Sequence, residues 1–246
     1  MKAMIFAAGI GSRLKPYTLH TPKALVEVGG KPLLQWIIEK IINAGISQIV
    51  INIHHFGEQI IDFLTQNKNF GIEITISDER DLLLDTGGGL KKAGWYLQGE
   101  ESFLLHNVDI FSTIDLRSLI NFHQEKQPLA TLAVKERPGS RYLLINNQNQ
   151  LCGWENIKTD EKIIARPDKK FIQTAFSGIH VVSPEIFDLI QEEGVFSITQ
   201  LYLRLARQNV LLGYDHSQDY WNDLGKPETL LKAEEAIKSF GPEKFL

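Results

Sequence analysis

The sequence has little cysteine and no excess of positive charge. A single cysteine, Cys152, excludes a disulfide within the chain, so we expect the protein to be located in the reducing cytoplasm. We expect Cys152 itself to be a packing residue. The net charge of -4 argues against nucleic-acid binding, which usually requires a basic excess. No apolar run is long enough to span a bilayer, and the N-terminal one, 4–8, is too short for a signal peptide. We therefore expect neither a nucleic-acid nor a membrane partner.

What is present is an alternation of two hydrophobic periods. Strand-like apolar runs and segments with helical apolar spacing follow one another through the first half of the chain. Strands are expected at 2–8, 48–53, 72–77, 102–109 and 129–134, and helices at 31–45, 57–67, 87–97 and 115–125. This order predicts an α/β fold with a mainly parallel central sheet and helices on both faces.

The second half of the chain has a looser pattern, which predicts an elaborated C-terminal half. We expect a hairpin at 141–154, strands at 171–182 and 210–215, and helices at 183–193, 197–208 and 226–240. No repeat, low-complexity stretch or linker interrupts the sequence, so a single domain over 1–246 is predicted.

A glycine loop follows the first expected strand. Ligands of open parallel sheets bind where such loops emerge, and Gly9 and Gly11 would let backbone N–H groups approach phosphate oxygens. The dinucleotide pattern GxGxxG fails because Leu14 takes its third glycine position, and the Walker pattern is also absent. What remains is GxGxR followed by Lys23. Two cations at different distances from a glycine turn fit an extended triphosphate. We prefer this interpretation to that of a solvated surface turn with ordinary charges.

These spacings resemble those of a known family. The stretch AAGIGSRLKPYTLHTPKALVEVGGKPLL, residues 7–34, is similar to the signature of the sugar-1-phosphate nucleotidyltransferases, the NDP-sugar pyrophosphorylases. The resemblance covers most of the chain and is weaker at 138–171. It implies a Rossmann-like nucleotidyltransferase fold and a reaction that converts an NTP and a sugar 1-phosphate into an NDP-sugar and pyrophosphate.

The resemblance also implies a set of site residues. Arg13, Lys23 and Asp109 would be catalytic, and Asp109 and Asp223 would bind Mg²⁺. The nucleotide would be bound by Ala8, Gly9, Gly11, Ser12, Arg13, Lys23, Thr86 and Gly87, and the sugar by Asn107, Glu155 and Gly178. Asn156 replaces a lysine that touches the sugar phosphate in many relatives, so the cation for that phosphate stays open between Lys23 and the metal alone. The role of Glu79, near the expected base site, also stays open.

The motifs TLHTPK, TGGG and FSGI resemble those of the muramate branch of the family. This resemblance implies UTP and N-acetylmuramate 1-phosphate as substrates in peptidoglycan recycling. Guanylyltransferases for mannose or heptose 1-phosphate and phosphocholine cytidylyltransferases remain alternatives. Outside this enzyme class, a nucleotide-binding regulatory module of the same fold remains possible, and a nicotinamide-dependent oxidoreductase is disfavoured by the failed GxGxxG pattern. We expect structural roles for His54, His55 and His106, and the sequence does not indicate the oligomeric state.

Overall fold

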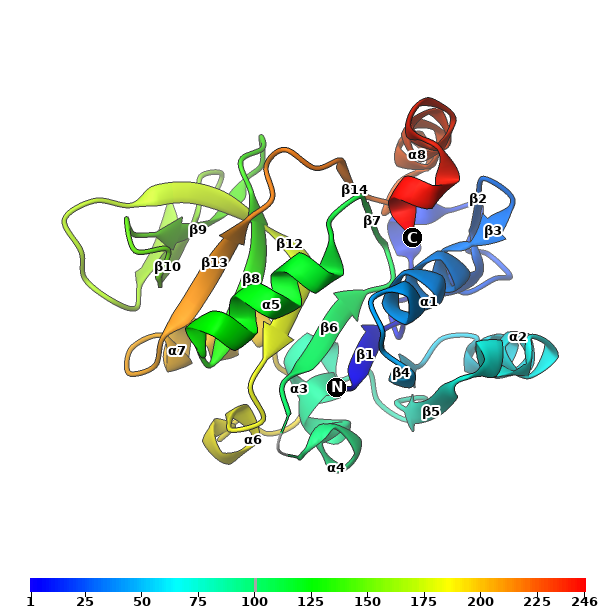
Figure 1. Cartoon of the computed structure of the whole chain (residues 1–246), viewed down its shortest axis with the longest axis horizontal. Coiled ribbons are helices and arrows are strands. Elements are labelled where there is room, and N and C mark those ends of the chain that lie inside the picture. Colours follow the sequence, from blue (N-terminus) through cyan, green and yellow to red (C-terminus); the bar gives the residue numbers. More distant parts are fainter. Residues whose placement is uncertain (100) are drawn as a thin grey trace.

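The computed structural model describes residues 1–99 and 101–246 and contains a ten-stranded sheet (Figure 1). The strand order is β11-β10-β9-β12-β6-β1-β4-β5, and β8 and β13 join this path through β12. The strands of this sheet are β1 (Ala3–Phe6), β4 (Gln48–Ile53), β5 (Glu73–Asp78), β6 (Phe103–Asn107), β8 (Ala130–Lys135), β9 (Arg141–Ile145), β10 (Leu151–Asn156), β11 (Glu161–Ile164), β12 (Ile172–Val182) and β13 (Leu211–Asp215).

The first half of the chain forms a parallel core in which β6, β1, β4 and β5 run side by side. The four residues of β1 are all buried, as expected for a strand that is covered on both faces. In the second half, β12 runs antiparallel to β6, β8 and β9. The α/β fold with a mostly parallel central sheet and flanking helices is thereby confirmed, and the antiparallel strands form the elaborated second half.

Helices cover the two faces of the sheet in two groups. The helices of the chain are α1 (Leu33–Asn43), α2 (Gly57–Gln66), α3 (Asp85–Lys92), α4 (Gly94–Leu97), α5 (Leu116–Lys126), α6 (Ile186–Leu189), α7 (Ile198–Leu205) and α8 (Pro227–Phe240). Ala3 and Ile5 pack with α1, α2 and α5, whereas Met4 and Phe6 pack with α3, α4, α6 and α7. This division follows from the alternation of side chains along β1.

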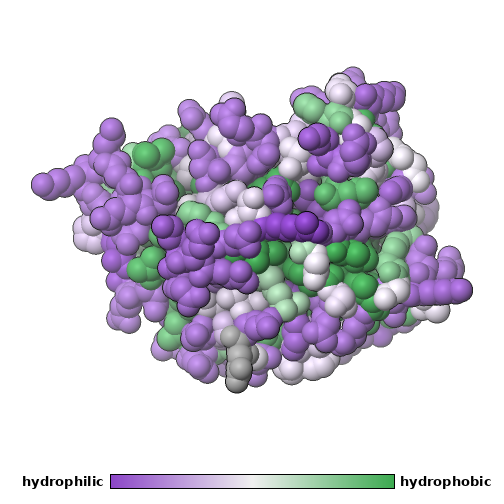
Figure 2. All heavy atoms as spheres, viewed as in Figure 1, coloured by the Kyte–Doolittle hydropathy of each residue, from purple (hydrophilic) through white to green (hydrophobic). Residues whose placement is uncertain are grey.

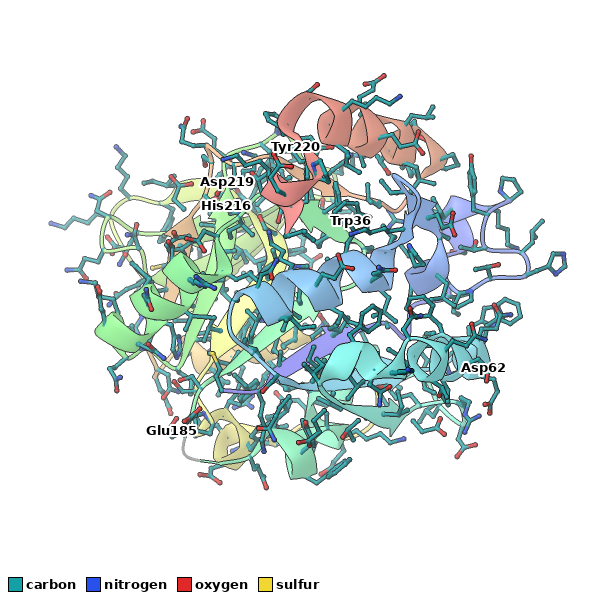
Figure 3. All side chains as sticks on the ribbon, turned by 45° about the vertical axis from the view of Figure 1, so that its right-hand side comes forward. Trp36, Asp62, Glu185, His216, Asp219 and Tyr220 are labelled. Atoms are coloured by element: carbon teal, nitrogen blue, oxygen red, sulfur yellow. The ribbon has the colours of Figure 1, made fainter. Side chains whose placement is uncertain are left out.

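A third apolar cluster joins the C-terminal helix to the N-terminal part of the chain. Trp36 of α1 makes edge contacts with Phe111 and Phe245, and Leu230 of α8 belongs to the same cluster. Two short two-stranded sheets lie in this region (Figure 1): β2 (Glu27–Val28) with β3 (Lys31–Pro32), and β7 (Ile110–Ser112) with β14 (Trp221–Asp223). Figure 3 shows Trp36 on the ribbon of α1 below α8. The cluster therefore brings the residues after β14 next to the first glycine loop.

Short 3₁₀ segments complete the described chain: Ser12–Leu14, Lys23–Leu25, Lys68–Gly71 and Pro242–Phe245. Figure 2 shows that hydrophilic side chains cover most of one face of the molecule, with hydrophobic ones visible mainly in its middle. In residues 1–99 and 101–246, no helix has the length and apolar character needed to cross a membrane.

Two expected helices were wrong in their extent. The segment 183–193 forms only the four-residue α6, and the chain then turns at Gly194, whose φ is +68°. After this turn the Phe196 carbonyl accepts hydrogen bonds from the N–H groups of Gly87 and Gly88. The expected helix at 87–97 begins earlier, at Asp85, and breaks at Ala93 into α3 and α4. Tertiary contact with the start of α3 thus overrides the helical spacing of 190–193.

Candidate active site

A cavity of about 520 Å³ lies at the carboxyl ends of β1, β4, β5 and β6. This is the edge at which parallel α/β sheets bind ligands. The cavity is lined by Phe6, Ala8, Gly9, Gly11, Ser12, Arg13, Lys23, Asn52, Glu79, Leu83, Asp85, Thr86, Asn107, Val108, Asp109, Val195 and Gly225. The first glycine loop and the ends of four strands therefore line the same cavity.

The glycine loop is folded tightly against the segment that carries Lys23. Gly11 has a φ of +68°, and a Cβ added there would lie 3.0 Å from Thr18 Cγ2 and 3.1 Å from Lys23 Cβ. The Thr18 hydroxyl donates a hydrogen bond of 2.8 Å to the Gly11 carbonyl. At Gly9, by contrast, an added Cβ would meet no protein atom within 4 Å. Gly11 is required by the loop itself, whereas the space over Gly9 is open.

Two cations and two carboxylates meet beside this loop. The Lys23 Nζ atom lies 2.5 Å from Asp109 Oδ2 and 4.0 Å from Asp223 Oδ1, and an Nη atom of Arg13 lies 3.9 Å from Asp223 Oδ2. The Lys23 side chain is 8% exposed, whereas that of Arg13 is 64% exposed. Lys23 is thus a buried part of the cavity wall, whereas the Arg13 side chain is accessible to groups that enter from solvent.

The pairing of β7 with β14 brings the two carboxylates together. Asp223 is opposite Ile110 in this ladder, and the Leu224 N–H donates a hydrogen bond of 2.9 Å to the Asp109 carbonyl. The Asp223 Oδ1 atom is buried but has no hydrogen-bond partner. Burial and the charge of Asp109 raise the pKa of Asp223, while Lys23, Arg13 and Arg137 lower it. An added cation would stabilise this carboxylate pair, because it would supply the missing partner for Oδ1.

Oxygen atoms are the ligands that this pair offers. Hard divalent cations such as Mg²⁺ prefer carboxylate oxygens and keep further positions for water or phosphate. No group of three or more His, Cys, Asp or Glu side chains in the described parts of the chain is placed to hold a metal alone. A metal at Asp109 and Asp223 would therefore need oxygen atoms from water or substrate.

Gly225 is a site residue that the sequence did not reveal. A Cβ added there would lie 2.8 Å from Asp223 Oδ1 and 2.9 Å from an Nη atom of Arg13. The only signal was its place two residues after Asp223. A glycine at 225 thus allows the arginine and the carboxylate to approach each other.

The opposite side of the cavity holds a buried amide and a buried carboxyl. Asn52 Oδ1 accepts a hydrogen bond of 2.7 Å from the Ala7 N–H, and Asn52 Nδ2 donates one of 2.8 Å to Glu79 Oε1. Glu79 Oε2 accepts from the Leu84 N–H at 3.2 Å. Glu79 is fully buried, and burial raises its pKa. Sequence reasoning left Glu79 open and missed Asn52, although an asparagine inside the apolar run QIVINI was a signal.

Most of the expected nucleotide residues line the cavity, as does Asn107 of the expected sugar residues. Gly87 does not line it. The N–H of Gly87 donates to the Phe196 carbonyl, and an added Cβ would lie 2.4 Å from the Phe196 ring, so this glycine serves helix packing. Thr86 does line the cavity, but its hydroxyl also accepts a hydrogen bond from the Ile198 N–H.

The other expected sugar residues lie outside the lining of this cavity. Gly178 has a φ of +73°, and an added Cβ would lie 2.8 Å from Asn107 Nδ2, so it supports Asn107 from behind. Glu155 lies on β10, where it pairs with Lys162 at 3.3 Å and accepts a hydrogen bond from Gln173. The structure therefore brings the residues expected to bind phosphate and metal together, whereas Glu155 does not line this cavity.

Of the residues expected to be structural, His54, His106 and Cys152 are packed or hydrogen-bonded, whereas His55 is exposed beside the Phe56 ring. His106 is buried, its Nδ1 contacts the Asn107 carbonyl at 2.8 Å, and burial lowers its pKa to about 4. His54 Nδ1 contacts the Glu79 carbonyl at 2.7 Å, and Cys152 is buried. For these three residues the structural interpretation is confirmed.

Known proteins resemble this chain in sequence and in fold. Over 226 residues, the chain is 33% identical to the N-acetylmuramate alpha-1-phosphate uridylyltransferase of Neisseria meningitidis serogroup B, covering 92% of this chain and 93% of that protein. It is 30% identical to mannose-1-phosphate guanyltransferase 2 of Candida glabrata over 94% of this chain, but spans only 63% of that protein's length. A solved UDP-glucose pyrophosphorylase from Acinetobacter baumanii has the same fold, with a TM-score of 0.79 at 18% identity, covering 99% of this chain and 95% of that one.

The family assignment rests on the greater part of the sequence. Residues 2–239 match the family described as nucleotidyl transferase, and they contain every element from β1 to α8 except the last residue of that helix. The relative from Neisseria matches over nearly its whole length. The chain belongs to the nucleotidyl transferase family.

Proposed function

We propose that this chain transfers a nucleotidyl group from an NTP to a sugar 1-phosphate. A phosphate oxygen of the sugar 1-phosphate forms a bond to the α-phosphorus, the bond from that phosphorus to the bridging β-phosphate oxygen breaks, and pyrophosphate leaves. The observation that carries this proposal is the meeting of the glycine loop with Arg13, Lys23, Asp109 and Asp223 around one cavity.

The residues have separate tasks in this reaction. The nucleophile is already an anion, so catalysis requires positioning and charge neutralisation rather than a general base. Backbone N–H groups of the loop at Gly9 and the exposed Arg13 side chain would bind the phosphates that leave. Lys23, fixed in the wall of the cavity, would neutralise charge that develops at the α-phosphate.

The carboxylates would hold a divalent cation, for which Mg²⁺ fits best. Asp109 and Asp223 supply hard oxygen ligands, and the buried Asp223 Oδ1 lacks a partner in the protein. When bound there, the ion would neutralise phosphate charge and orient the phosphate oxygens. The two aspartates would fix its position, and Lys23 would remain beside it.

For the substrates we propose UTP and N-acetylmuramate 1-phosphate, which would give the chain a part in peptidoglycan recycling. Support comes from the Neisseria uridylyltransferase, whose length this chain nearly spans, and from the motifs TLHTPK, TGGG and FSGI. The main alternative is GTP with mannose 1-phosphate, favoured by the yeast guanyltransferases at similar identity but over less than two thirds of their length. The residues proposed to bind phosphate and metal would not distinguish these pairs, because they would contact phosphate oxygens and not the base.

One experiment separates the candidates. The four NTPs are combined with N-acetylmuramate 1-phosphate, mannose 1-phosphate, glucose 1-phosphate and phosphocholine, and pyrophosphate release is measured. We expect kcat/KM for UTP to exceed that for GTP at least about tenfold, which requires about 1.4 kcal/mol of discrimination. A better GTP and mannose 1-phosphate pair would reject the uridylyl assignment alone. Binding of an NTP without pyrophosphate release from any pair would favour a regulatory module.

A further inference from the structure

Arg137 is a third cation beside the carboxylate pair, and the proposed mechanism has not used it. It lies two residues after β8, and its guanidinium carbon is 3.9 Å from the centroid of the Trp221 ring. One Nη atom donates a hydrogen bond of 3.1 Å to the Phe176 carbonyl. The Nε atom is buried and has no hydrogen-bond partner. Leaving a buried N–H without an acceptor destabilises the protein. A ligand oxygen could supply the acceptor that the Arg137 Nε–H lacks.

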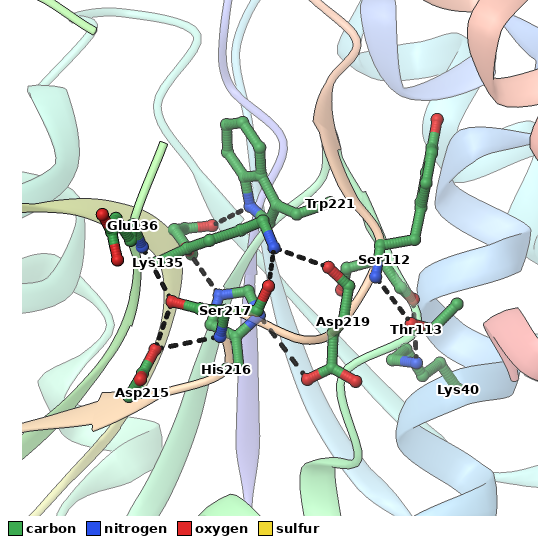
Figure 4. Close-up of polar contacts among 12 residues, drawn as sticks. Lys40, Ser112, Thr113, Lys135, Glu136, Asp215, His216, Ser217, Asp219 and Trp221 are labelled. Carbon is green, nitrogen blue, oxygen red and sulfur yellow. Dashed lines mark hydrogen bonds and ion pairs between the residues drawn. The ribbon is translucent and has the colours of Figure 1, made fainter. Parts of the chain in front are cut away.

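The neighbours of Arg137 form a braced frame. The Trp221 Nε1 atom donates to the Ser177 carbonyl at 2.9 Å, which ties β14 to β12. The Lys135 Nζ atom donates to the carbonyls of Ser217 and Asp219 at 2.5 and 2.7 Å, as Figure 4 shows, which ties the end of β8 to the segment before β14. The guanidinium plane is thus held by the indole on one side and by β12 at its end, and stacking of this kind fixes its orientation.

This frame holds Arg137 against β14, the strand that also carries Asp223. Trp221 and Asp223 are two residues apart on β14, so their side chains lie on the same face of that strand. The Phe176 and Ser177 carbonyls that anchor the frame directly precede Gly178, which packs against the cavity residue Asn107. Arg137 therefore stacks on a residue two positions before Asp223 and bonds to a carbonyl two positions before Gly178.

The three cations differ in their ion pairs. Lys23 is paired with Asp109, and both Lys23 and Arg13 lie within 4.0 Å of Asp223. Arg137 has no carboxylate within 4.0 Å among the residues that the structure describes. The reaction brings in a second phosphate besides the triphosphate, and Arg137 is the cation of this cluster whose charge is not already paired.

We propose that Arg137 binds the phosphate group of the acceptor, the sugar 1-phosphate, and so positions its attacking oxygen. The proposal rests on the proposed nucleotidyl transfer. A fixed guanidinium with a free Nε–H suits a phosphate, because its N–H groups match adjacent phosphate oxygens. Arg137, which follows β8, would then supply the positive charge that Asn156 at the end of β10 lacks.

The test compares the KM values of the two substrates in Arg137→Ala and Arg137→Lys. With N-acetylmuramate 1-phosphate as acceptor, or mannose 1-phosphate if the wild type prefers it, we expect Arg137→Ala to raise the acceptor KM at least about tenfold, or about 1.4 kcal/mol. The KM for the NTP should change less than about twofold. Arg137→Lys should recover only part of the loss, because it keeps the charge but not the planar donor set. Added guanidinium chloride at low millimolar concentration should partly restore Arg137→Ala.

Arg141→Ala, which removes an exposed arginine at the start of β9, is the matched control and should leave both KM values unchanged. Equal KM changes for both substrates, or a lower melting temperature with an unchanged acceptor KM, would reject the proposal. If Arg137→Ala does not fold, Arg137→Lys and Arg137→Gln are judged by the same KM comparison. A wild type that releases no pyrophosphate from any pair would reject the proposed function. An active wild type together with an unchanged acceptor KM in Arg137→Ala would reject only the role proposed for Arg137.

Discussion

The Nζ atom of Lys23 lies 2.5 Å from Oδ2 of Asp109, although 86 positions separate the two residues in the chain. The Lys23 side chain is 8% exposed and the Asp109 side chain 23% exposed, so little water screens this contact. In the free protein the lysine neutralises a proposed metal ligand. If a cation were held by this carboxylate, the Lys23 ammonium would become available to a phosphate at the same place.

Lys23→Ala should therefore lower kcat more than it raises KM. The lysine would act on charge that develops at the α-phosphate, and we expect kcat at saturating NTP and Mg²⁺ to fall at least about 100-fold, or about 2.7 kcal/mol. Steady-state kinetics check this, with Lys15→Ala as control because Lys15 is an exposed lysine of the same loop. A Lys23→Ala enzyme with only a raised KM would mean that the interaction is equally strong in the ground state.

Removal of either proposed metal ligand should nearly abolish turnover. Asp109→Asn and Asp223→Asn keep the size of the side chain but remove the charge that would hold a divalent cation. We expect each variant to stay folded by circular dichroism and to need at least about tenfold more Mg²⁺ for half-maximal activity. Asp62→Asn, at an exposed position of α2 (Figure 3), is the control. Near-normal activity of either site variant at limiting Mg²⁺ would remove that residue from the metal site.

The sequence predicted the parts of the fold that have strong periodicity. The apolar run at β1 and the helical spacing of α1 are local properties, and both elements appear where they were expected. The three-residue strands β7 and β14 have no such pattern, yet their pairing places Asp223 beside Asp109. The closeness of these carboxylates could be inferred only from the family resemblance, because it depends on tertiary pairing.

The same distinction applies within the site. Gly9 and Gly11 were recognised from their spacing, whereas the roles proposed for Gly225 and Arg137 depend on neighbours that are distant in the sequence. The loop after α6 was wrongly expected to be helical, because nothing local indicates that the Phe196 carbonyl bonds to the start of α3. Local patterns could not predict contacts that form only when the sheet is complete.

Gly9→Ala should separate ligand binding from folding. An added Cβ at Gly9 meets no protein atom within 4 Å, so the melting temperature should change by less than about 2 °C. If triphosphate oxygens approach this backbone, the methyl group will hinder them, and the KM for the NTP should rise at least about tenfold. Gly99→Ala, which also meets no atom within 4 Å, is the control and should alter neither quantity. An unchanged NTP KM in Gly9→Ala would place the phosphates elsewhere.

The last prediction concerns pH and a histidine far from the proposed site. His123 on α5 is buried, and its Nδ1 lies 2.9 Å from Thr131 Oγ1, with Ser102 and Ser183 hydroxyls at 3.1 and 3.2 Å from Nε2. Burial lowers its pKa from 6.5 to about 4. Because the unfolded chain binds a proton at a higher pH than the folded one, this histidine stabilises the fold fully above pH 6.5, and that contribution is lost as the pH falls toward 4.

Between pH 7.5 and 5.5, His123 alone should lower the free energy of unfolding by about 1.3 kcal/mol, since the unfolded histidine becomes protonated while the folded one stays neutral. Urea unfolding at the two pH values measures this loss for the wild type, His123→Gln and the exposed control His20→Gln. His123→Gln is expected to be less stable at pH 7.5 but to lose about 1.3 kcal/mol less on acidification. His20→Gln should lose as much as the wild type. Equal losses in all three proteins would show that His123 takes up its proton without unfolding, and that its hydroxyl neighbours accommodate the charge.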